Sequence, residues 1–164
     1  MKLVVAIPAL NEAATVGRVI REARVALRDT PHEVVVVDDG STDTTVSEAR
    51  AAGAVVVLHG INRGVGVAFQ TGVREALARG ADILVHLDAD GQFNPADIPA
   101  LLAPVLDGSA DIAICSRFLK DEFRPAMPAV HTVPAPVTVL DPALAVTVPV
   151  EYGATVWITL SRLR

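Results

Sequence analysis

Hydrophobic positions in the first 115 residues follow two patterns, each typical of one kind of secondary structure. Continuous apolar runs rich in valine and isoleucine predict buried strands at residues 2–7, 33–37, 54–58, 82–87 and 111–115. Apolar residues that recur every three or four positions predict amphipathic helices at residues 12–28, 43–52, 65–79 and 95–106. Strands and helices therefore alternate along the chain.

This alternation predicts an α/β fold with a mostly parallel sheet and helices on both faces. The strands are apolar along their whole length, as expected when both faces of a sheet are covered. Ligands of such folds bind at the carboxyl ends of the strands. Polar residues follow four of the predicted strands, at positions 11–12, 38–39, 62–63 and 88–90. We therefore expect all four strand ends to line one crevice.

The composition changes after residue 124. Residues 125–149 contain six of the eleven prolines, and residues 125–161 contain only two charged side chains, Asp141 and Glu151. Proline lacks the backbone donor that a central strand or a membrane-spanning helix needs, so we expect edge strands or extended loops here and no transmembrane segment in this chain. We divide the chain into an α/β domain at residues 1–124 and an atypical Pro- and Val-rich segment at residues 125–164.

Charge and cysteine content exclude several classes of function. The formal net charge is −5, from 14 basic and 19 acidic side chains, and no basic stripe is present, so nucleic acid is not an expected partner. The single cysteine, Cys115, allows neither a disulfide framework nor a zinc site. The apolar stretch before Pro8 is too short for a signal peptide. These features predict a cytoplasmic protein.

Residues 38–43 (DDGSTD) follow a predicted strand and precede a predicted helix. Ser41, Thr42 and Asp43 are natural N-cap residues for that helix. Capping does not explain two adjacent carboxylates at the end of an apolar strand, because they crowd like charges. One of them could accept hydrogen bonds from a base N–H or a ribose hydroxyl. The motif alone does not choose between capping and ligand contact.

Residues 88–92 (DADGQ) also follow a predicted strand. The carboxylates of Asp88 and Asp90 are hard oxygen ligands that could hold a divalent cation against two phosphates. A calcium loop of the EF-hand type is excluded, because Gln92 takes the third acidic position and Pro99 stands where the terminal Glu belongs. A plain turn at Asp90 and Gly91 is the alternative.

Two further segments carry weaker signals. Residues 62–66 (NRGVG) could cradle a phosphate with glycine amides, but Phe69 replaces the third glycine of a dinucleotide fingerprint, so a helix-entry turn is an equal alternative. Arg117 ends the fifth strand and could clamp phosphate oxygens or form a salt bridge with a nearby acid. The four histidines show no metal-ligand spacing, and His86 lies inside an apolar strand, which predicts a core position.

Taken together, the motifs resemble family 2 glycosyltransferases with a GT-A fold, most closely the dolichyl-phosphate mannose synthase-like and polyprenyl-phosphate sugar transferase branch. The resemblance extends from residue 3 to about residue 118. It rests on five segments that occur in family order, at residues 7–12 (IPALNE), 37–43 (VDDGSTD), 62–66 (NRGVG), 86–92 (HLDADGQ) and 116–118 (SRF).

The resemblance implies a nucleotide-sugar-binding domain at residues 1–124 and a role for individual residues. The implied substrate contacts are Pro8, Ala9, Glu12, Asp39, Asp88, Ala89, Asp90 and Arg117. The implied ligands of Mg²⁺ or Mn²⁺ are Asp88, Asp90 and Gln92, and the implied catalytic residues are Asp90 and Arg117.

The implied reaction is the inverting transfer of a sugar from a nucleoside diphosphate-sugar to a polyprenyl (dolichyl-type) phosphate at the membrane surface. The phosphate oxygen of this acceptor is already anionic, so no protein base is needed, in keeping with the lack of a third acidic motif. Arg117 would hold the acceptor phosphate in line, and the metal would stabilise the leaving diphosphate. The implied location is cytoplasmic, with a peripheral position at the inner face of the membrane.

Residues 125–164 lack the basic and amphipathic continuation of the family, and we interpret them as a truncated or frame-shifted acceptor region. A catalytically inactive module that binds nucleotide-sugars is therefore an alternative function. A nucleotidyltransferase with a similar sheet is a third possibility, but the glycine-rich, lysine-containing loop of that class is missing after Ile7.

Overall fold

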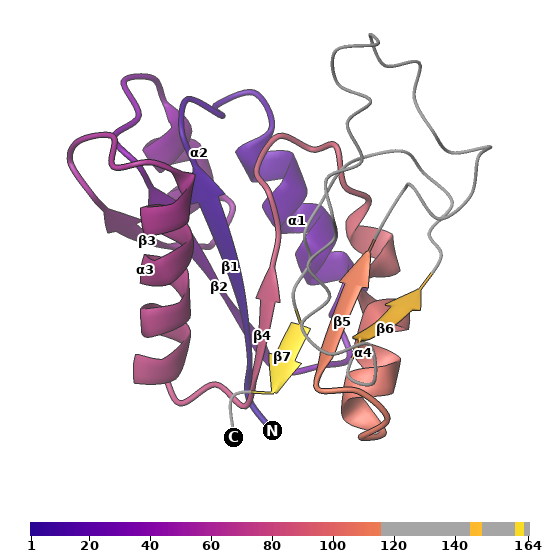
Figure 1. Ribbon diagram of the computed structural model, residues 1–164. Coiled ribbons are helices and arrows are strands. Elements are labelled where there is room, and N and C mark those ends of the chain that lie inside the picture. Colours follow the sequence, from indigo (N-terminus) through magenta and orange to yellow (C-terminus); the bar gives the residue numbers. More distant parts are fainter. Residues whose placement is uncertain (116–144, 149–159, 163–164) are drawn as a thin grey trace, which may run out of the picture.

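The fold is shown in Figure 1 as a computed structural model, which describes residues 1–115, 145–148 and 160–162. In chain order its elements are β1 (Leu3–Ala9), α1 (Val16–Ala26), β2 (His32–Asp38), α2 (Thr45–Ala51), β3 (Val55–Leu58), α3 (Val65–Ala78), β4 (Ile83–His86), η1 (Pro95–Asp97), α4 (Ile98–Leu106), β5 (Ile112–Cys115), β6 (Ala145–Val148) and β7 (Leu160–Arg162). All the predicted strands and helices are present, with boundaries shifted by a few residues.

The strands form one sheet in the order β3-β2-β1-β4-β7-β5-β6. The first four neighbours pair in parallel, so the carboxyl ends of β1, β2, β3 and β4 meet at one edge of the sheet. β7 runs antiparallel to both β4 and β5, and β6 pairs in parallel with β5. The predicted mostly parallel α/β fold is therefore confirmed.

The segment after residue 124 contributes differently from the prediction. β6 is an edge strand, as expected, but β7 lies inside the sheet between β4 and β5. β7 contains no proline and follows the last proline of the chain, Pro149, so its backbone donors are available for pairing. The valine- and proline-rich stretch at residues 133–139 lies outside the described residues.

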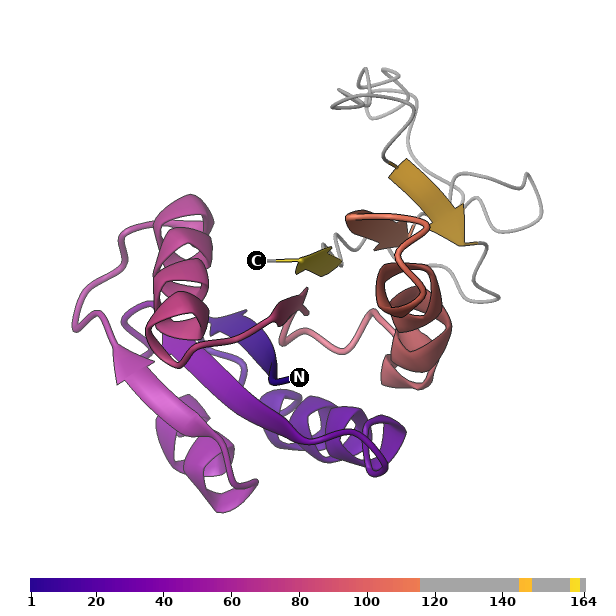
Figure 2. The same cartoon turned by 90° about the horizontal axis from the view of Figure 1, so that it is seen from below.

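Both faces of the central strands β1, β2 and β4 are buried, which explains the uninterrupted apolar runs of these strands. Alternate residues of β1 point to opposite sides: Leu3, Val5 and Ile7 pack with α1 and α4, whereas Val4 and Ala6 pack with α3. Figure 2 shows this layering from below, with α3 on one side of the sheet and α1 on the other.

The core prediction for His86 is confirmed. Its relative exposure is 6%, and its ring meets that of Phe69 edge-on, with 4.7 Å between the ring centroids. The helices of the described part of the chain are, in turn, too short or too polar to cross a bilayer.

Helix α1 begins later than the sequence pattern predicts, at Val16 rather than Glu12. The amides of Thr15 and Val16 both donate to the Glu12 carbonyl, at 3.1 and 2.9 Å, and form a tight turn before the helix. Asn11 has a φ of 56° and turns the chain out of β1. Glu12 is consequently a loop residue at the carboxyl edge of the sheet.

Gly40 allows the loop after β2 to lie directly against the loop after β3. Its φ is 87°, and a Cβ at this position would lie 2.6 Å from both the Asn62 amide nitrogen and the Ile61 carbonyl carbon. Only glycine fits such a close backbone approach. The contact fixes the spacing between these two loops.

We expect Gly40→Ala to destabilise the fold far more than Gly60→Ala. Gly60 also has a positive φ, 75°, but no atom lies within 4 Å of a Cβ built there. The control should therefore cost about 1 kcal/mol of unfolding free energy, the penalty for a positive φ. Gly40→Ala should cost about 2 kcal/mol more, because backbone atoms must move.

Urea denaturation with an unchanged m-value measures both differences. Equal losses for the two variants would show that the close approach of the loops does not constrain the fold.

Candidate functional site

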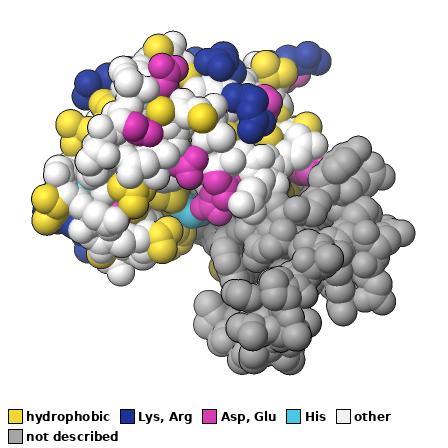
Figure 3. All heavy atoms as spheres, turned by 90° about the horizontal axis from the view of Figure 1, so that it is seen from above, with side chains coloured by type: hydrophobic (Ala, Val, Ile, Leu, Met, Phe, Trp, Pro, Cys, Tyr) yellow, Lys and Arg dark blue, Asp and Glu magenta, His cyan; other side chains and the backbone are white. Residues whose placement is uncertain are grey.

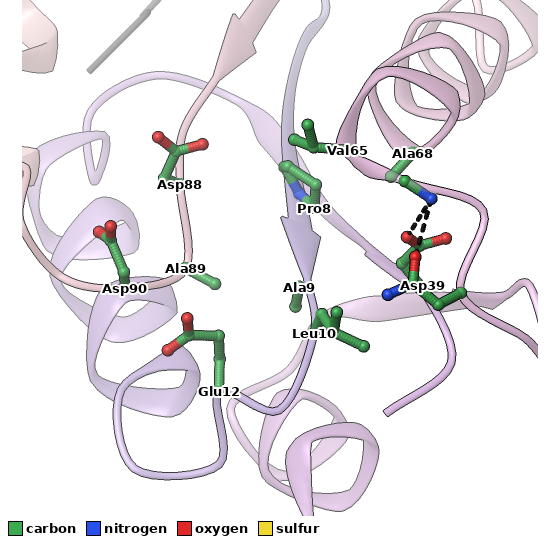
Figure 4. Close-up of a pocket in the computed structure, with 12 residues that line it drawn as sticks. Pro8, Ala9, Leu10, Glu12, Asp39, Val65, Ala68, Asp88, Ala89 and Asp90 are labelled. Carbon is green, nitrogen blue, oxygen red and sulfur yellow. Dashed lines mark hydrogen bonds between the residues drawn. The ribbon is translucent and has the colours of Figure 1, made fainter. Parts of the chain in front are cut away.

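A cavity of about 350 Å³ opens at the carboxyl edge of the sheet, where the predicted crevice was expected. It is lined by Pro8, Ala9, Leu10, Glu12, Asp39, Asn62, Gly64, Val65, Ala68, Asp88, Ala89 and Asp90. These residues come from β1, from the segments that follow β1, β2, β3 and β4, and from α3 (Figure 4). Figure 3 looks down on this edge and shows acidic side chains gathered near its middle.

The loops after β1 and β2 are joined by hydrogen bonds between side chains and backbone. Ser41 Oγ accepts from the Asn11 amide at 2.9 Å, and Asn11 Oδ1 accepts from the Thr42 amide at 2.8 Å. Thr45 Oγ1 accepts from the Glu12 amide at 2.7 Å. These bonds supply acceptors for backbone amides that lie beyond the ends of the strands and have no partner in the sheet. They also hold Glu12 in place beside the cavity.

The predicted capping role of Ser41 and Thr42 is wrong. Helix α2 begins at Thr45, and its N-cap residue, Thr44, makes no side-chain capping bond. Of the three predicted caps only Asp43 serves the helix start, since its Oδ1 accepts from the Thr45 amide at 2.9 Å. The Ser41 hydroxyl and the Thr42 amide and hydroxyl bond instead to Asn11, in the loop after β1.

Asp39 is buried, and hydrogen-bond donors surround it. Its Oδ1 accepts from His59 Nδ1 at 2.7 Å and from the Arg63 amide at 3.0 Å, and its Oδ2 accepts from the Gly64 amide at 2.8 Å. Burial raises the pKa of Asp39, but the bonds from His59 and the two amides outweigh burial, so the pKa lies below its ordinary value. Asp39 is therefore an ionised carboxylate in the cavity wall, whereas Asp38 bonds to the turn after β2.

The pKa of Asp88 is shifted in the opposite direction from that of Asp39. Burial, the charge of Asp90 and the charge of Glu12 all raise its pKa, in that order of importance. Figure 4 shows these three carboxyl groups on one side of the cavity and Asp39 on the other. At one end of the cavity, hydrogen-bond donors stabilise the charge of Asp39. At the other end, the carboxyl groups of Asp88, Asp90 and Glu12 lie close together, so negative charge accumulates there.

The predicted turn at residues 90 and 91 is present together with the acidic site. Asp90 Oδ1 accepts from the Gln92 amide at 2.8 Å, and Gly91 has a φ of 73°. The turn does not remove the carboxylates from the cavity, because Asp88 and Asp90 both line it. The two interpretations of this motif are therefore compatible.

The acidic end fits a divalent cation whose coordination is completed by a ligand. Asp88 and Asp90 supply hard carboxylate oxygens. Burial and then the charges of Asp90 and Glu12 raise the pKa of Asp88, and a cation would relieve the charge repulsion. Within the described residues, no group of three His, Cys, Asp or Glu side chains could hold a metal by itself. Mg²⁺ in particular is commonly bound by one or two carboxylates together with substrate phosphates.

Gln92, a predicted metal ligand, does not line this cavity. It lies in a neighbouring hollow of about 300 Å³ with Arg18 and Glu22 of α1, which form an ion pair at 3.3 Å. Gln92 therefore contacts Asp90 through its backbone amide but does not line the cavity with Asp88 and Asp90. Arg117, the remaining predicted site residue, lies outside the described residues.

The loop at residues 62–66 is a helix-entry turn. Gly64 is the N-cap residue of α3, with a φ of 92°. The amides of Arg63 and Gly64 already donate to Asp39, so they are not available to a phosphate. The glycine-rich loop therefore supplies hydrogen-bond donors to the buried Asp39 carboxylate.

His59 contacts the cavity residue Asp39, and the sequence motifs did not identify it. It follows β3 directly, and its ring lies between Asp39 and Thr71 of α3. Its place after an apolar strand is the same signal that pointed to Asp39 and Asp88.

A comparison with protein families matches residues 4–153 to the model of Glycosyl transferase family 2. The chain is 38% identical over 122 residues to the undecaprenyl-phosphate mannosyltransferase of Micrococcus luteus, covering 71% of this chain and 49% of that protein. It is 30% identical over 144 residues to the UDP-N-acetylglucosamine–dolichyl-phosphate N-acetylglucosaminyltransferase of Methanococcus voltae, covering 77% and 56%. The chain spans about half the length of the curated relatives it matches.

Among solved structures, the chain is similar to glucosyl-3-phosphoglycerate synthase from Mycobacterium tuberculosis in complex with Mn²⁺, UDP-glucose and phosphoglyceric acid. The TM-score is 0.59 at 34% sequence identity, and the match covers 70% of this chain and 43% of the other.

We expect Asp88→Asn to stabilise the metal-free chain at pH 8 by about 1 kcal/mol, because it removes a carboxylate held beside Asp90 and Glu12. The raised pKa means that folding favours the protonated side chain. The advantage should therefore be absent below the ordinary pKa of 3.8 and grow as the pH rises through the raised value.

Urea unfolding in the presence of a chelator, repeated across this pH range, measures the effect. Asp107→Asn is the control of opposite sign, since hydrogen bonds from Ser109 lower the pKa of Asp107 and its loss should destabilise at neutral pH. Destabilisation by Asp88→Asn at pH 8 would contradict the charge accumulation described here.

Proposed function

Since the chain belongs to glycosyl transferase family 2, we propose that it binds a nucleoside diphosphate-sugar at the carboxyl edge of its sheet and transfers the sugar, with inversion, to a polyprenyl phosphate. Mg²⁺ or Mn²⁺ assists the reaction. The observation that carries the proposal is a single cavity with a compensated Asp39 at one end and the uncompensated Asp88 and Asp90 at the other. A nucleoside diphosphate has the matching polarity, with hydrogen-bond donors at one end and a diphosphate at the other.

The nucleoside end of the proposed site is formed by Pro8, Ala9 and Asp39. Asp39 can accept a hydrogen bond from a base N–H or a ribose hydroxyl, because its pKa is lowered and it stays ionised at neutral pH. Pro8 and Ala9 end β1 between the two ends of the cavity and contribute apolar lining there (Figure 4).

The diphosphate end is formed by Asp88, Ala89 and Asp90, with Glu12 beside them. Asp88 and Asp90 would hold the metal, which when bound offsets the negative charge of the diphosphate. Glu12 is held in place by its amide, which donates to Thr45, and by its Oε2, which accepts from Thr15 Oγ1 at 2.7 Å. Asp90 is the catalytic acidic residue of this proposal.

The acceptor in the proposed reaction is a lipid phosphate, whose oxygen is anionic at neutral pH and attacks the anomeric carbon without a protein base. Catalysis then consists of aligning the two substrates and stabilising the departing diphosphate. Arg117 is proposed to hold the acceptor phosphate, on the strength of its sequence motif alone. The proposal includes a peripheral position at the inner face of the membrane, where such acceptors lie.

Two of the similar proteins support this choice of acceptor by name, an undecaprenyl-phosphate mannosyltransferase and a dolichyl-phosphate N-acetylglucosaminyltransferase. The similar solved structure carries a sugar nucleotide with Mn²⁺ but a phosphoglyceric acid acceptor.

A second candidate function is a nucleotide-sugar-binding module without transfer activity. The described cavity residues are assigned to the donor and the metal, and both candidate functions share these ligands.

Calorimetric titration with UDP-sugars and GDP-sugars, with and without Mn²⁺, tests the donor site. We expect one of the two nucleotides to bind only with the metal, and Asp90→Ala to weaken that binding by at least about tenfold, because it removes a metal-holding carboxylate. Asp29→Ala is the matched control, since the Asp29 side chain is 90% exposed and pairs only with the exposed Arg28 in the described ion pairs. Metal-independent binding, or unchanged binding in Asp90→Ala, would contradict the proposal.

Incubation of the bound donor with a polyprenyl phosphate then separates the two candidate functions. A lipid-linked sugar of inverted anomeric configuration is the expected product. Donor binding without this product would favour the inactive module.

A further inference from the structure

We propose that His59 is a positioning residue for the nucleoside end of the site, which fixes the Asp39 carboxylate so that it presents one free acceptor to the nucleoside. This inference rests on the proposed function, because it assigns Asp39 to the nucleoside. His59 itself does not line the cavity, so it acts on a ligand only through Asp39.

Both ring nitrogens of His59 are engaged, and this fixes the orientation of the ring. Nδ1 lies 2.7 Å from Asp39 Oδ1, and Nε2 lies 2.9 Å from Thr71 Oγ1. The His59 amide also donates to the Asp38 carbonyl at 2.9 Å, which extends the β2–β3 pairing past the end of β3. The side chains of His59 and Asp39 are 6% and 5% exposed, so water does not compete for these bonds.

The direction of the hydrogen bond follows from the charge of its partner. Asp39 has a lowered pKa and is ionised at neutral pH, so it can only accept, and Nδ1 must carry a proton. Thr71 can then donate to a neutral Nε2 or accept from a protonated one, because a hydroxyl does both. His59 therefore donates to Asp39 in either of its charge states.

The bonds leave Asp39 with a defined capacity for a ligand. A carboxylate has about four acceptor positions, two on each oxygen. His59 and the Arg63 amide occupy both positions on Oδ1, and the Gly64 amide occupies one on Oδ2. The bonds of the described residues leave a single acceptor position, which suits one donor of a base edge or one ribose hydroxyl. Without His59, one position on Oδ1 would be empty and the carboxylate would lose its strongest support against rotation.

A purely structural role is the competing explanation, since the same bonds join the ends of β2 and β3 to α3. The two roles predict different measurements. A structural residue changes the free energy of unfolding, whereas a positioning residue also changes nucleotide affinity, and does so only while Asp39 is present.

The test measures the dissociation constants of UDP and GDP with Mn²⁺ for the whole chain and its His59 variants. We expect His59→Leu to raise the dissociation constant of the preferred nucleotide by about tenfold, because it removes a charge-assisted hydrogen bond to Asp39. His59→Asn keeps an amide N–H close to the Nδ1 position and should restore affinity to within about threefold of the wild type. A loss in His59→Asn as large as that in His59→Leu would overturn the proposal.

His32→Leu is the matched control. His32 begins β2 at the opposite edge of the sheet, and its Nδ1 contacts the Thr30 carbonyl at 2.8 Å. His32→Leu should leave nucleotide affinity unchanged.

Thr71→Val gives a second route if His59→Leu does not fold, because it removes only the partner of Nε2. We expect it to weaken binding by about threefold, and wild-type affinity in this variant would count against the proposal.

A double-mutant cycle with Asp39→Asn distinguishes action through Asp39 from an independent effect. In the Asp39→Asn background, His59→Leu should change affinity by less than about twofold. Independent, additive losses would overturn the positioning role.

If the wild type binds neither nucleotide with Mn²⁺, the proposed function itself fails and the inference fails with it. If the wild type binds and His59→Leu binds equally well, only the inference fails.

Discussion

Backbone amides that emerge from a buried parallel sheet must find new hydrogen-bond acceptors, and the rest of this structure depends on how they do so. At the carboxyl edge the acceptors are side chains of neighbouring loops. Ser41 accepts from Asn11, Thr45 accepts from Glu12, and Asp39 accepts from Arg63 and Gly64. The loops that line the cavity are therefore fixed by one another and not by the ligand. A site assembled in this way is largely preformed before anything binds.

The same constraint produces two carboxylates of different character within one cavity. The amide donors and His59 compensate Asp39, and its pKa is lowered despite burial. Asp88 has other carboxylates for neighbours, and its pKa is raised. Environments that move the pKa values of similar groups in opposite directions are typical of functional sites, because they assign different roles to the same chemical group. In the proposed function, Asp39 accepts a hydrogen bond from the nucleoside, whereas Asp88 helps to hold the cation.

The sequence predicted the frame of this site well, for a physical reason. Strands buried on both faces must be apolar throughout, so polar residues at their ends stand out, as Asp39 and Asp88 do. Parallel pairing then brings all such ends to one edge of the sheet. The polar residues that follow the strands in sequence therefore line the same cavity. Glu12 is a partial exception, because its amphipathic surroundings predicted a helical residue and the turn at Thr15 placed it in a loop.

Features that depend on partners distant in sequence could not be predicted in this way. Ser41 has the chemistry of a helix cap, but the Asn11 amide, 30 residues away, is its partner. His59 gains its role from Asp39 and from Thr71, which lie on two other elements. β7 is only three residues long and carries no periodic pattern, so its position inside the sheet is set by the unpaired edges of β4 and β5.

The proposed function makes the two ends of the cavity interdependent. In the proposed function Asp88 and Asp90 hold the cation, and diphosphate oxygens and water would complete its coordination. The diphosphate in turn meets the charges of Glu12, Asp88 and Asp90, and binds well only when a cation offsets them. Each ligand must then raise the affinity of the other by the same factor. A nucleoside anchored at Asp39 increases that factor, because it places the diphosphate beside Asp88 and Asp90 and leaves less freedom to be lost on metal binding.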